Sequence, residues 1–259
     1  MRFLALSLRQ ARYNLVAYLR SARTVVFALA MPVAFLVLFN SVFGGAGKTT
    51  SVGGFHLDFI AFFTGGLAAY GVVLGTFTGV LVAIVSAREA GWLKRFRGTP
   101  MPPGVFLAGQ IGYLSVTELA LVVVMLAVSV TCYGLQVHLV SVLAMCCYTL
   151  VGVFTFAALA LALTAVVTTT EMASSVGPFT VVILSFVSGV FLPPALMPSW
   201  LTTLSTYLPL QPLAASMQRA LASPSGTGFE LRTFLVVAVW GVGAFAVAQR
   251  TFTWQPRRR

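Results

Sequence analysis

The segment 43–50, FGGAGKTT, has residue types that bind nucleotide phosphates. A P-loop reads G-x-x-x-x-G-K-[ST], and its backbone N–H groups and lysine surround the phosphates. Gly47, Lys48 and Thr49 match the second half, but Val42 stands where the first glycine is required. The segment also follows an apolar run, whereas a P-loop follows a buried strand. We therefore interpret it as a glycine-rich turn with no nucleotide role.

Acid–base and metal chemistry have few residues to use in this chain. The acids are Asp58, Glu89, Glu118, Glu171 and Glu230. His56 and Asp58 are too few to hold a metal ion, and His138 stands alone. Three cysteines, Cys132, Cys146 and Cys147, form neither a disulfide framework nor a CxxC pair. We predict no catalytic residue, metal site or cofactor on this chain. A membrane-embedded transferase, a further alternative, needs a cluster of His, Asp or Glu that the sequence lacks.

The elements that position these residues are membrane spans. The 259 residues are 59% hydrophobic and only 8% charged, whereas a soluble domain carries about 25% charged residues. A spanning helix needs about 20 apolar residues, and open sheet edges cannot be satisfied in hydrocarbon. The sequence thus predicts an all-α integral membrane protein, with a single transmembrane domain over 1–259. Six spans are predicted, at 24–43, 59–85, 105–131, 139–167, 172–192 and 233–249.

Basic residues predict the orientation of the chain. Thirteen Lys and Arg side chains flank the spans on one side, and Lys48, Arg219 and Arg232 lie on the other. By the positive-inside rule, both termini are cytoplasmic and 43–50 lies outside. The net charge of +11 indicates contact with anionic lipid rather than nucleic acid. Glu171, in a short cytoplasmic turn, is expected to cap the fifth span.

Residues 1–23 are predicted to form an interfacial helix. At about 100° per residue, their five arginines fall within an arc of roughly 80°, and Leu4, Leu8, Leu15 and Leu19 cluster away from them. A basic amphipathic helix on the inner leaflet explains this pattern. A simple positive-inside flank is the alternative.

The cytoplasmic connection 86–103, SAREAGWLKRFRGTPMPP, carries a family signature. It resembles the ERE-x-G-T-x-K-R-L-R-x-T-P pattern of ABC-2 type transporter permeases, departing from it at Ala87 and Trp92. The later stretch before the last span resembles the family's SG-x-x-F-P…P-x-W…P segment. The matching residues are Arg88, Glu89, Gly91, Leu93, Lys94, Arg95, Arg97, Thr99 and Pro100, then Ser188, Gly189, Phe191, Pro193, Met197, Pro198, Trp200, Leu208 and Pro209.

The resemblance implies a subunit of a bacterial drug- or antibiotic-exporter-like transporter in the plasma membrane. Its 86–103 loop would be the coupling loop, with Arg88, Glu89, Trp92, Lys94 and Arg95 contacting a separate ATPase subunit. That subunit would be present in two copies and would carry the ATP and Mg²⁺. A second permease copy, identical or a paralogue, would complete the complex.

The segment 193–231 is predicted to re-enter the outer leaflet. Five prolines, at positions 193, 194, 198, 209 and 212, interrupt its apolar first part, so it cannot span as one helix. Non-helical backbone at membrane depth must be buried in protein or line a cavity. We expect short re-entrant helices, with an ordinary exoplasmic loop as the alternative. The family resemblance assigns an outer gate to Phe191, Pro193, Pro198 and Trp200.

Spans two, three and five hold the candidate substrate path. Gly71, Gly75 and Gly79 are spaced for close helix packing. By family resemblance, spans two and five of two copies line a central path. Its predicted residues are Phe62, Phe63, Tyr70, Phe77, Phe179 and Phe186, with Glu118 in span three.

Glu118 is the only formal charge within a predicted span, and intramembrane acids are functional candidates. It is expected to bind a cationic substrate, to be protonated, or to pair with a polar neighbour such as Gln110. The leading interpretation of the chain is the permease subunit of an exporter for an amphiphilic or lipid-like compound. A self-sufficient proton-coupled carrier or channel is the alternative, and Glu118 is its main support.

Overall fold

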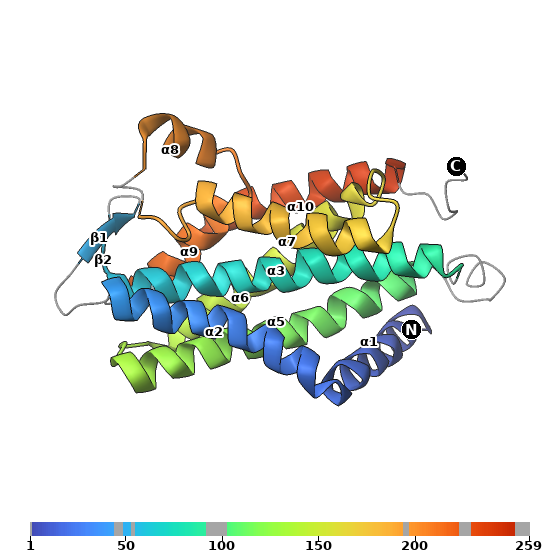
Figure 1. The fold of residues 1–259 in the computed structure, drawn as a ribbon, viewed down its shortest axis with the longest axis horizontal. Helices are drawn as coiled ribbons and strands as arrows, with labels where there is room; N and C mark the ends of the chain where they lie inside the picture. Colours follow the sequence, from blue (N-terminus) through green and yellow to red (C-terminus); the bar gives the residue numbers. More distant parts are fainter. Residues whose placement is uncertain are drawn as a thin grey trace.

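Six long helices run side by side in the computed structural model, which describes residues 2–43, 49–52, 55–91, 103–193, 197–222 and 229–251 (Figure 1). Each of the six is long and apolar enough to cross a membrane. This confirms the prediction of an all-α integral membrane protein with six spans. The helices are α2 (Ala22–Phe43), α3 (Phe59–Glu89), α5 (Pro103–Tyr133), α6 (Leu139–Leu163), α7 (Thr170–Val187) and α10 (Leu231–Thr251).

Two predicted span ends are wrong, and the structure gives the reasons. The fourth span was predicted to reach residue 167, but α6 ends at Leu163. Arg88 of α3 donates hydrogen bonds to the carbonyl oxygens of Thr164 and Val167, which follow this end. The fifth was predicted to reach residue 192, but α7 ends at Val187. Gly189 follows with φ 71°, a left-handed conformation that glycine adopts at low cost. The hydrophobicity of the sequence alone does not show where α6 and α7 end.

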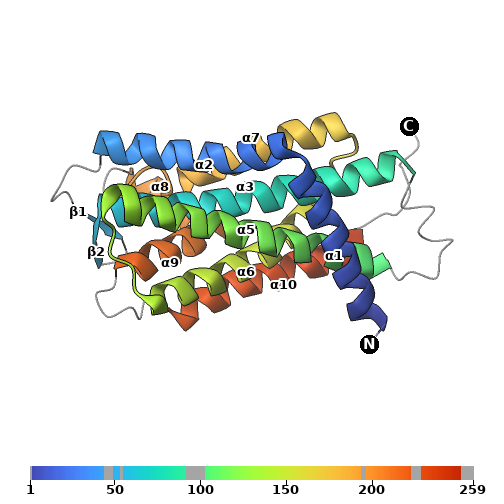
Figure 2. The same ribbon diagram turned by 90° about the horizontal axis from the view of Figure 1, so that it is seen from below.

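Helix α3 lies at the centre of the bundle. It packs against α2, α5, α6, α7 and the shorter α9 (Leu210–Ala222) (Figures 1 and 2). Most of its residues are buried, whereas α2, α7 and α10 leave large apolar faces exposed. With 31 residues at 1.5 Å per residue, α3 is about 46 Å long. It therefore extends beyond a hydrocarbon core of about 30 Å.

Helix α1 (Arg2–Arg20) crosses one end of the bundle and packs on α5 (Figure 2). A polar seam joins the two helices. Gln10 Nε2 donates to Asn14 Oδ1 at 3.0 Å, and Asn14 Nδ2 donates to Gln110 Oε1 at 3.2 Å. Leu4 and Leu8 instead point away from the protein and are exposed, as expected of a helix whose apolar face enters the inner leaflet.

The opposite end of the bundle carries a β-hairpin and two short helices. Strands β1 (Thr49–Val52) and β2 (Phe55–Asp58) pair antiparallel. The hairpin was not predicted, because four-residue strands are too short to show alternation in sequence. Helix α8 (Ser199–Ser205) is largely exposed, whereas α9 is buried between α3, α6 and α10. This burial is the arrangement expected of a re-entrant helix.

Candidate functional site

The end of α3 that leads into the 86–103 loop is tied to the α6–α7 turn by Arg88. The Arg88 guanidinium is buried, and it donates to the carbonyl oxygens of Thr164 at 2.9 Å and Val167 at 2.6 Å. These carbonyl groups follow the last turn of α6 and have no helical partner of their own. Arg88 therefore caps α6 from a different helix.

Glu89, the last residue of α3, performs the matching role for α7. Its Oε2 accepts a hydrogen bond from the Thr170 N–H at 3.0 Å and another from the Thr170 hydroxyl. The predicted capping acid was Glu171, which lies only in the first turn of α7. Sequence reasoning missed Glu89, because its partner is 81 positions away. The other residues predicted to contact the ATPase are Trp92, Lys94 and Arg95, which lie outside the described residues.

The glycines of α3 lie against α5 and α2. A Cβ on Gly71 would stand 2.5 Å from Leu121 Cδ2 and 3.3 Å from Pro32 Cγ. One on Gly75 would overlap the Glu118 carboxyl group, and one on Gly79 would meet Leu114 at 3.5 Å. The face of α3 that carries Gly71, Gly75 and Gly79 therefore packs against helices of the same chain. The missing side chain at Gly75 leaves room for the Glu118 carboxyl group.

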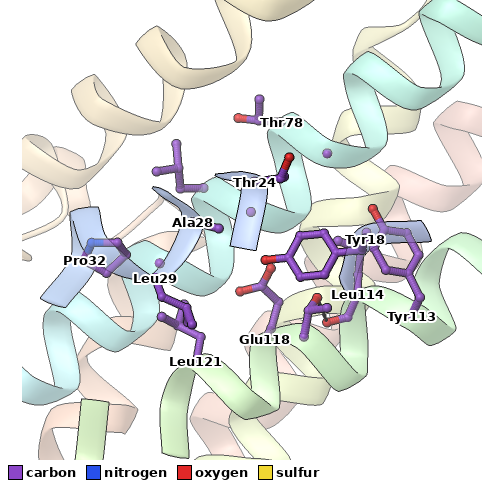
Figure 3. Close-up of a pocket in the computed structure, with 15 residues that line it drawn as sticks. Tyr18, Thr24, Ala28, Leu29, Pro32, Thr78, Tyr113, Leu114, Glu118 and Leu121 are labelled. Atoms are coloured by element: carbon purple, nitrogen blue, oxygen red, sulfur yellow. Dashed lines mark hydrogen bonds between the residues drawn. The ribbon is translucent and has the colours of Figure 1, made fainter. Parts of the chain in front are cut away.

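Glu118 lies on α5 and is only 6% exposed. It lines a cavity of about 290 Å³ between α1, α2, α3 and α5 (Figure 3). The Tyr18 hydroxyl points toward its carboxyl group, and the Tyr113 ring lies behind that of Tyr18 (Figure 3). Burial and, to a smaller extent, the charge of Glu118 raise the pKa of Tyr18. The Tyr18 hydroxyl therefore keeps its proton at neutral pH.

The pairing of Glu118 with Gln110 is not formed. The two residues are eight positions apart on one helix, which is about 12 Å along its axis. Gln110 instead accepts from Asn14 and donates to the Tyr113 hydroxyl at 3.2 Å. Within the part of the chain that the structure describes, no hydrogen bond or ion pair reaches the Glu118 carboxyl group.

Phe191 is the centre of an aromatic cluster in the half of the bundle near the β-hairpin. Its ring centroid lies 4.9 Å from that of Phe186, 5.2 Å from that of Tyr70, 5.7 Å from that of Phe39 and 5.9 Å from that of Phe35. The cluster joins the loop after α7 to α2 and α3. The Tyr70 hydroxyl and the Ser188 Oγ are buried without hydrogen-bond partners in the described structure.

The predicted path residues fall into two groups. Phe62, Phe63 and Tyr70 are fully buried within this one chain, and Phe77 lines a cavity between α3, α6 and α7. Phe179 and Phe186 lie on the outer face of α7 and are 67% and 48% exposed. Phe179 and Phe186 are therefore available to a second chain in this conformation, whereas Phe62, Phe63 and Tyr70 are not.

The predicted gate residues are likewise divided. Phe191 and Pro193 are buried, whereas Pro198 and Trp200 of the α8 region are exposed, Trp200 by 66%. Of the turn predicted at 43–50, Phe43 ends α2 and Thr49 and Thr50 begin β1, and residues 44–48 lie outside the described residues. Among the residues that are described, no group of three His, Cys, Asp or Glu side chains is placed to hold a metal ion.

Six apolar helices long enough to cross a membrane, with the end of α3 tied to the end of α6 and the start of α7, define a polytopic membrane protein. The family model for the ABC-2 type transporter matches residues 4–221. Because this match covers most of the chain, the protein belongs to the ABC-2 type transporter family. It is a membrane permease subunit of an ATP-binding cassette transporter. A search of curated proteins returns no match.

Proposed function

We propose that this permease exports an amphiphilic or lipid-like compound, using ATP hydrolysed on two copies of a separate ATPase subunit. The link from α3 to α7 through Glu89 is the observation that carries this proposal. The family membership itself implies partnership with an ATPase of the ATP-binding cassette type.

The hydrogen bonds of Arg88 and Glu89 supply a mechanical route for coupling. A force on the 86–103 loop acts first on the end of α3. Because Arg88 holds the end of α6 and Glu89 holds the start of α7, α6 and α7 move with it. The loop itself, with Trp92, Lys94 and Arg95, would contact the ATPase.

The exposed face of α7 supports a path formed with a second permease copy. Phe179, Ile183 and Phe186 are large, apolar and exposed, and they share one side of the helix at spacings of three and four residues. A second copy, identical or a paralogue, would cover this face. The resulting aromatic wall suits an amphiphilic substrate better than a small ion.

The Phe191 cluster supports a closed outer gate. Buried polar groups are almost always hydrogen-bonded, so the unpartnered Tyr70 hydroxyl and Ser188 Oγ favour a second conformation in which they meet water or substrate. Displacement of the 189–193 loop would expose both. Pro198 and Trp200 would lie at the outer membrane surface beside it.

The exposed side of α1 supports contact with anionic lipid at the inner face of a bacterial plasma membrane. Arg9, Arg12 and Arg20 line one surface groove together with Tyr13 and Val16. Each basic residue near an anionic surface contributes roughly 1 kcal/mol. Both termini would then be cytoplasmic.

Reconstitution of the chain with its ATPase in vesicles tests the function. Amphiphiles that are substrates should stimulate ATP hydrolysis and accumulate on the side opposite the ATPase. Glu89→Gln should reduce the stimulation at least severalfold while leaving the ATPase bound. Glu171→Gln, which removes the same charge from the first turn of α7, is the matched control and should stay near wild type. Transport driven by a proton gradient without the ATPase would contradict the proposal.

A further inference from the structure

The cavity around Glu118 has features that the coupling route does not use. Its carboxyl group is buried and unpartnered among the described residues. Removing an ionised carboxylate from water costs several kcal/mol, so such a group either takes up a proton or is compensated by a cation. A ligand that brings a positive charge into the cavity would supply that compensation.

Two tyrosine side chains line the same cavity as the carboxyl group. The ring centroids of Tyr18 and Tyr113 lie 6.4 Å apart, with 44° between the ring planes. The two residues come from α1 and α5, and both line the cavity (Figure 3). A cation over the face of an aromatic ring is attracted by its quadrupole, and cages of this kind bind alkylammonium groups. A carboxylate beside two such rings matches that chemistry.

The remaining wall excludes a hard metal ion. Divalent metal ions such as Ca²⁺ need about six to eight oxygen ligands, but most of the surface that lines the cavity is apolar. Two of the hydroxyl groups are already engaged, since Thr117 donates to the Leu114 carbonyl oxygen at 3.1 Å and Tyr113 accepts from Gln110. The aliphatic lining residues are Ala28, Leu29, Pro32, Leu74, Leu114 and Leu121.

The mouth of the cavity lies along α2. Thr24 and Ala28 line the cavity and are exposed, within two turns of the junction between α1 and α2. We propose that this cavity binds the ammonium head group of a cationic amphiphile, which reaches it from the inner leaflet beside α2. The assignment of this ligand as the transported substrate rests on the proposed export function. The binding itself does not need the ATPase.

The site is tested by measuring how tightly two probes bind to the purified chain. The chain is placed in nanodiscs of zwitterionic lipid, without its ATPase. The probes are a fluorescent alkyltrimethylammonium and a neutral analogue with a hydroxyl head group. The wild type should bind the ammonium probe about tenfold or more tightly than the neutral one, since a tenfold ratio needs only 1.4 kcal/mol. Glu118→Gln should abolish this preference, and Glu171→Gln should keep it. An unchanged preference in Glu118→Gln would overturn the proposal.

A second measurement uses only the wild-type chain. A hydrophobic carbodiimide should modify Glu118, and mass spectrometry of the modified peptide gives the rate. The ammonium probe should slow this reaction severalfold, and the neutral probe should not. Equal rates with both probes would mean that Glu118 is a protonated acid without a cationic ligand. Intact binding without ATPase stimulation would instead contradict the export function alone.

Discussion

At the scale of single residues, charged groups in this protein join helix ends that are far apart in sequence. Arg88 and Glu89 hold the α6–α7 turn. At the other end, Arg219 of α9 forms an ion pair with Glu230, just before α10. Thr233 donates to the same carboxylate at 2.6 Å, and the Glu230 N–H donates to the Tyr148 hydroxyl at 2.7 Å.

Arg88→Ala should destabilise the permease. It leaves the carbonyl groups of Thr164 and Val167 without their donors, and an unsatisfied buried group costs about 1–3 kcal/mol. Arg88→Lys keeps the charge but lacks the planar fork of guanidinium, so its effect should be intermediate. Thermal unfolding in detergent measures both. If Arg88→Ala unfolds at the wild-type midpoint, the capping role is wrong.

Glu230 should make the end of the bundle near the β-hairpin sensitive to acid. The hydrogen bond from Thr233 and the charge of Arg219 lower the pKa of Glu230 in the folded protein. Its stabilising contribution is therefore complete above the unfolded value of about 4.3 and is lost as the pH falls toward the lower folded pKa. Thermal midpoints of wild type and Glu230→Gln should differ at pH 7 and converge near pH 3. A constant difference would contradict this assignment.

At the scale of elements, the backbone of α9 approaches α3 closely at Gly65. A Cβ on Gly65 would stand 2.6 Å from the backbone N and Cα of Gln218, and 2.8 Å from the carbonyl carbon of Met217. These are main-chain atoms, which a rotamer change cannot move aside. Gly65 therefore sets how deeply α9 lies among the spans.

Gly65→Ala should displace α9 from α3. The overlap is with backbone, so we expect a loss of about 1–3 kcal/mol, typical of overpacked cores. Gly79→Ala is the matched control on the same helix, because its Cβ would meet Leu114 at an ordinary 3.5 Å. It should be neutral or stabilising by up to about 1 kcal/mol, since alanine favours helix. Unfolding midpoints that rank the two variants in the opposite order would contradict this packing.

At the scale of the whole molecule, the start of α1 and the end of α10 lie at the same end of the bundle, opposite the β-hairpin (Figure 1). The orientation of this bundle in the membrane follows from the basic residues. Lys48 and Lys94 are the only lysines in the chain, and they are predicted to lie on opposite sides of the membrane.

An amine reagent that does not cross membranes should modify Lys48 in intact cells and Lys94 only after lysis. The single pair of lysines makes the assignment by mass spectrometry direct. Lys48→Arg is the control that removes the external signal. Modification of Lys94 from outside would reverse the orientation proposed from the positive-inside rule.

The segment proposed as an outer gate should change its accessibility with the nucleotide state of the complex. Leu204 of α8 is half exposed, so Leu204→Cys provides a site for thiol reagents. The native Cys132, Cys146 and Cys147 must first be replaced, since Cys132 and Cys147 are exposed. Reaction rates at residue 204 should differ at least severalfold with and without ATP on the ATPase. The same rate in every state would mean that α8 does not move during transport.

The sequence by itself determined the membrane class, the number of spans and the family. These properties depend on hydrophobic runs of about 20 residues and on local motifs such as those in 86–103, and both can be read along the chain. The sequence also indicated that the segment before α10 is not one spanning helix, because its prolines exclude a continuous span, and the structure has the two short helices α8 and α9 there.

Only the tertiary structure decided which residues meet. Glu89 of the packed α3 accepts from the first N–H group of α7, beside the local cap in which the Thr169 hydroxyl accepts from the Met172 N–H. The backbone of another helix lies against Gly65, whereas Gly71, Gly75 and Gly79 meet only side chains. Tyr18 and Glu118 are 100 positions apart, and neither marks a site alone. A cavity depends on how helices pack, and the spacing of residues along one helix does not contain that information.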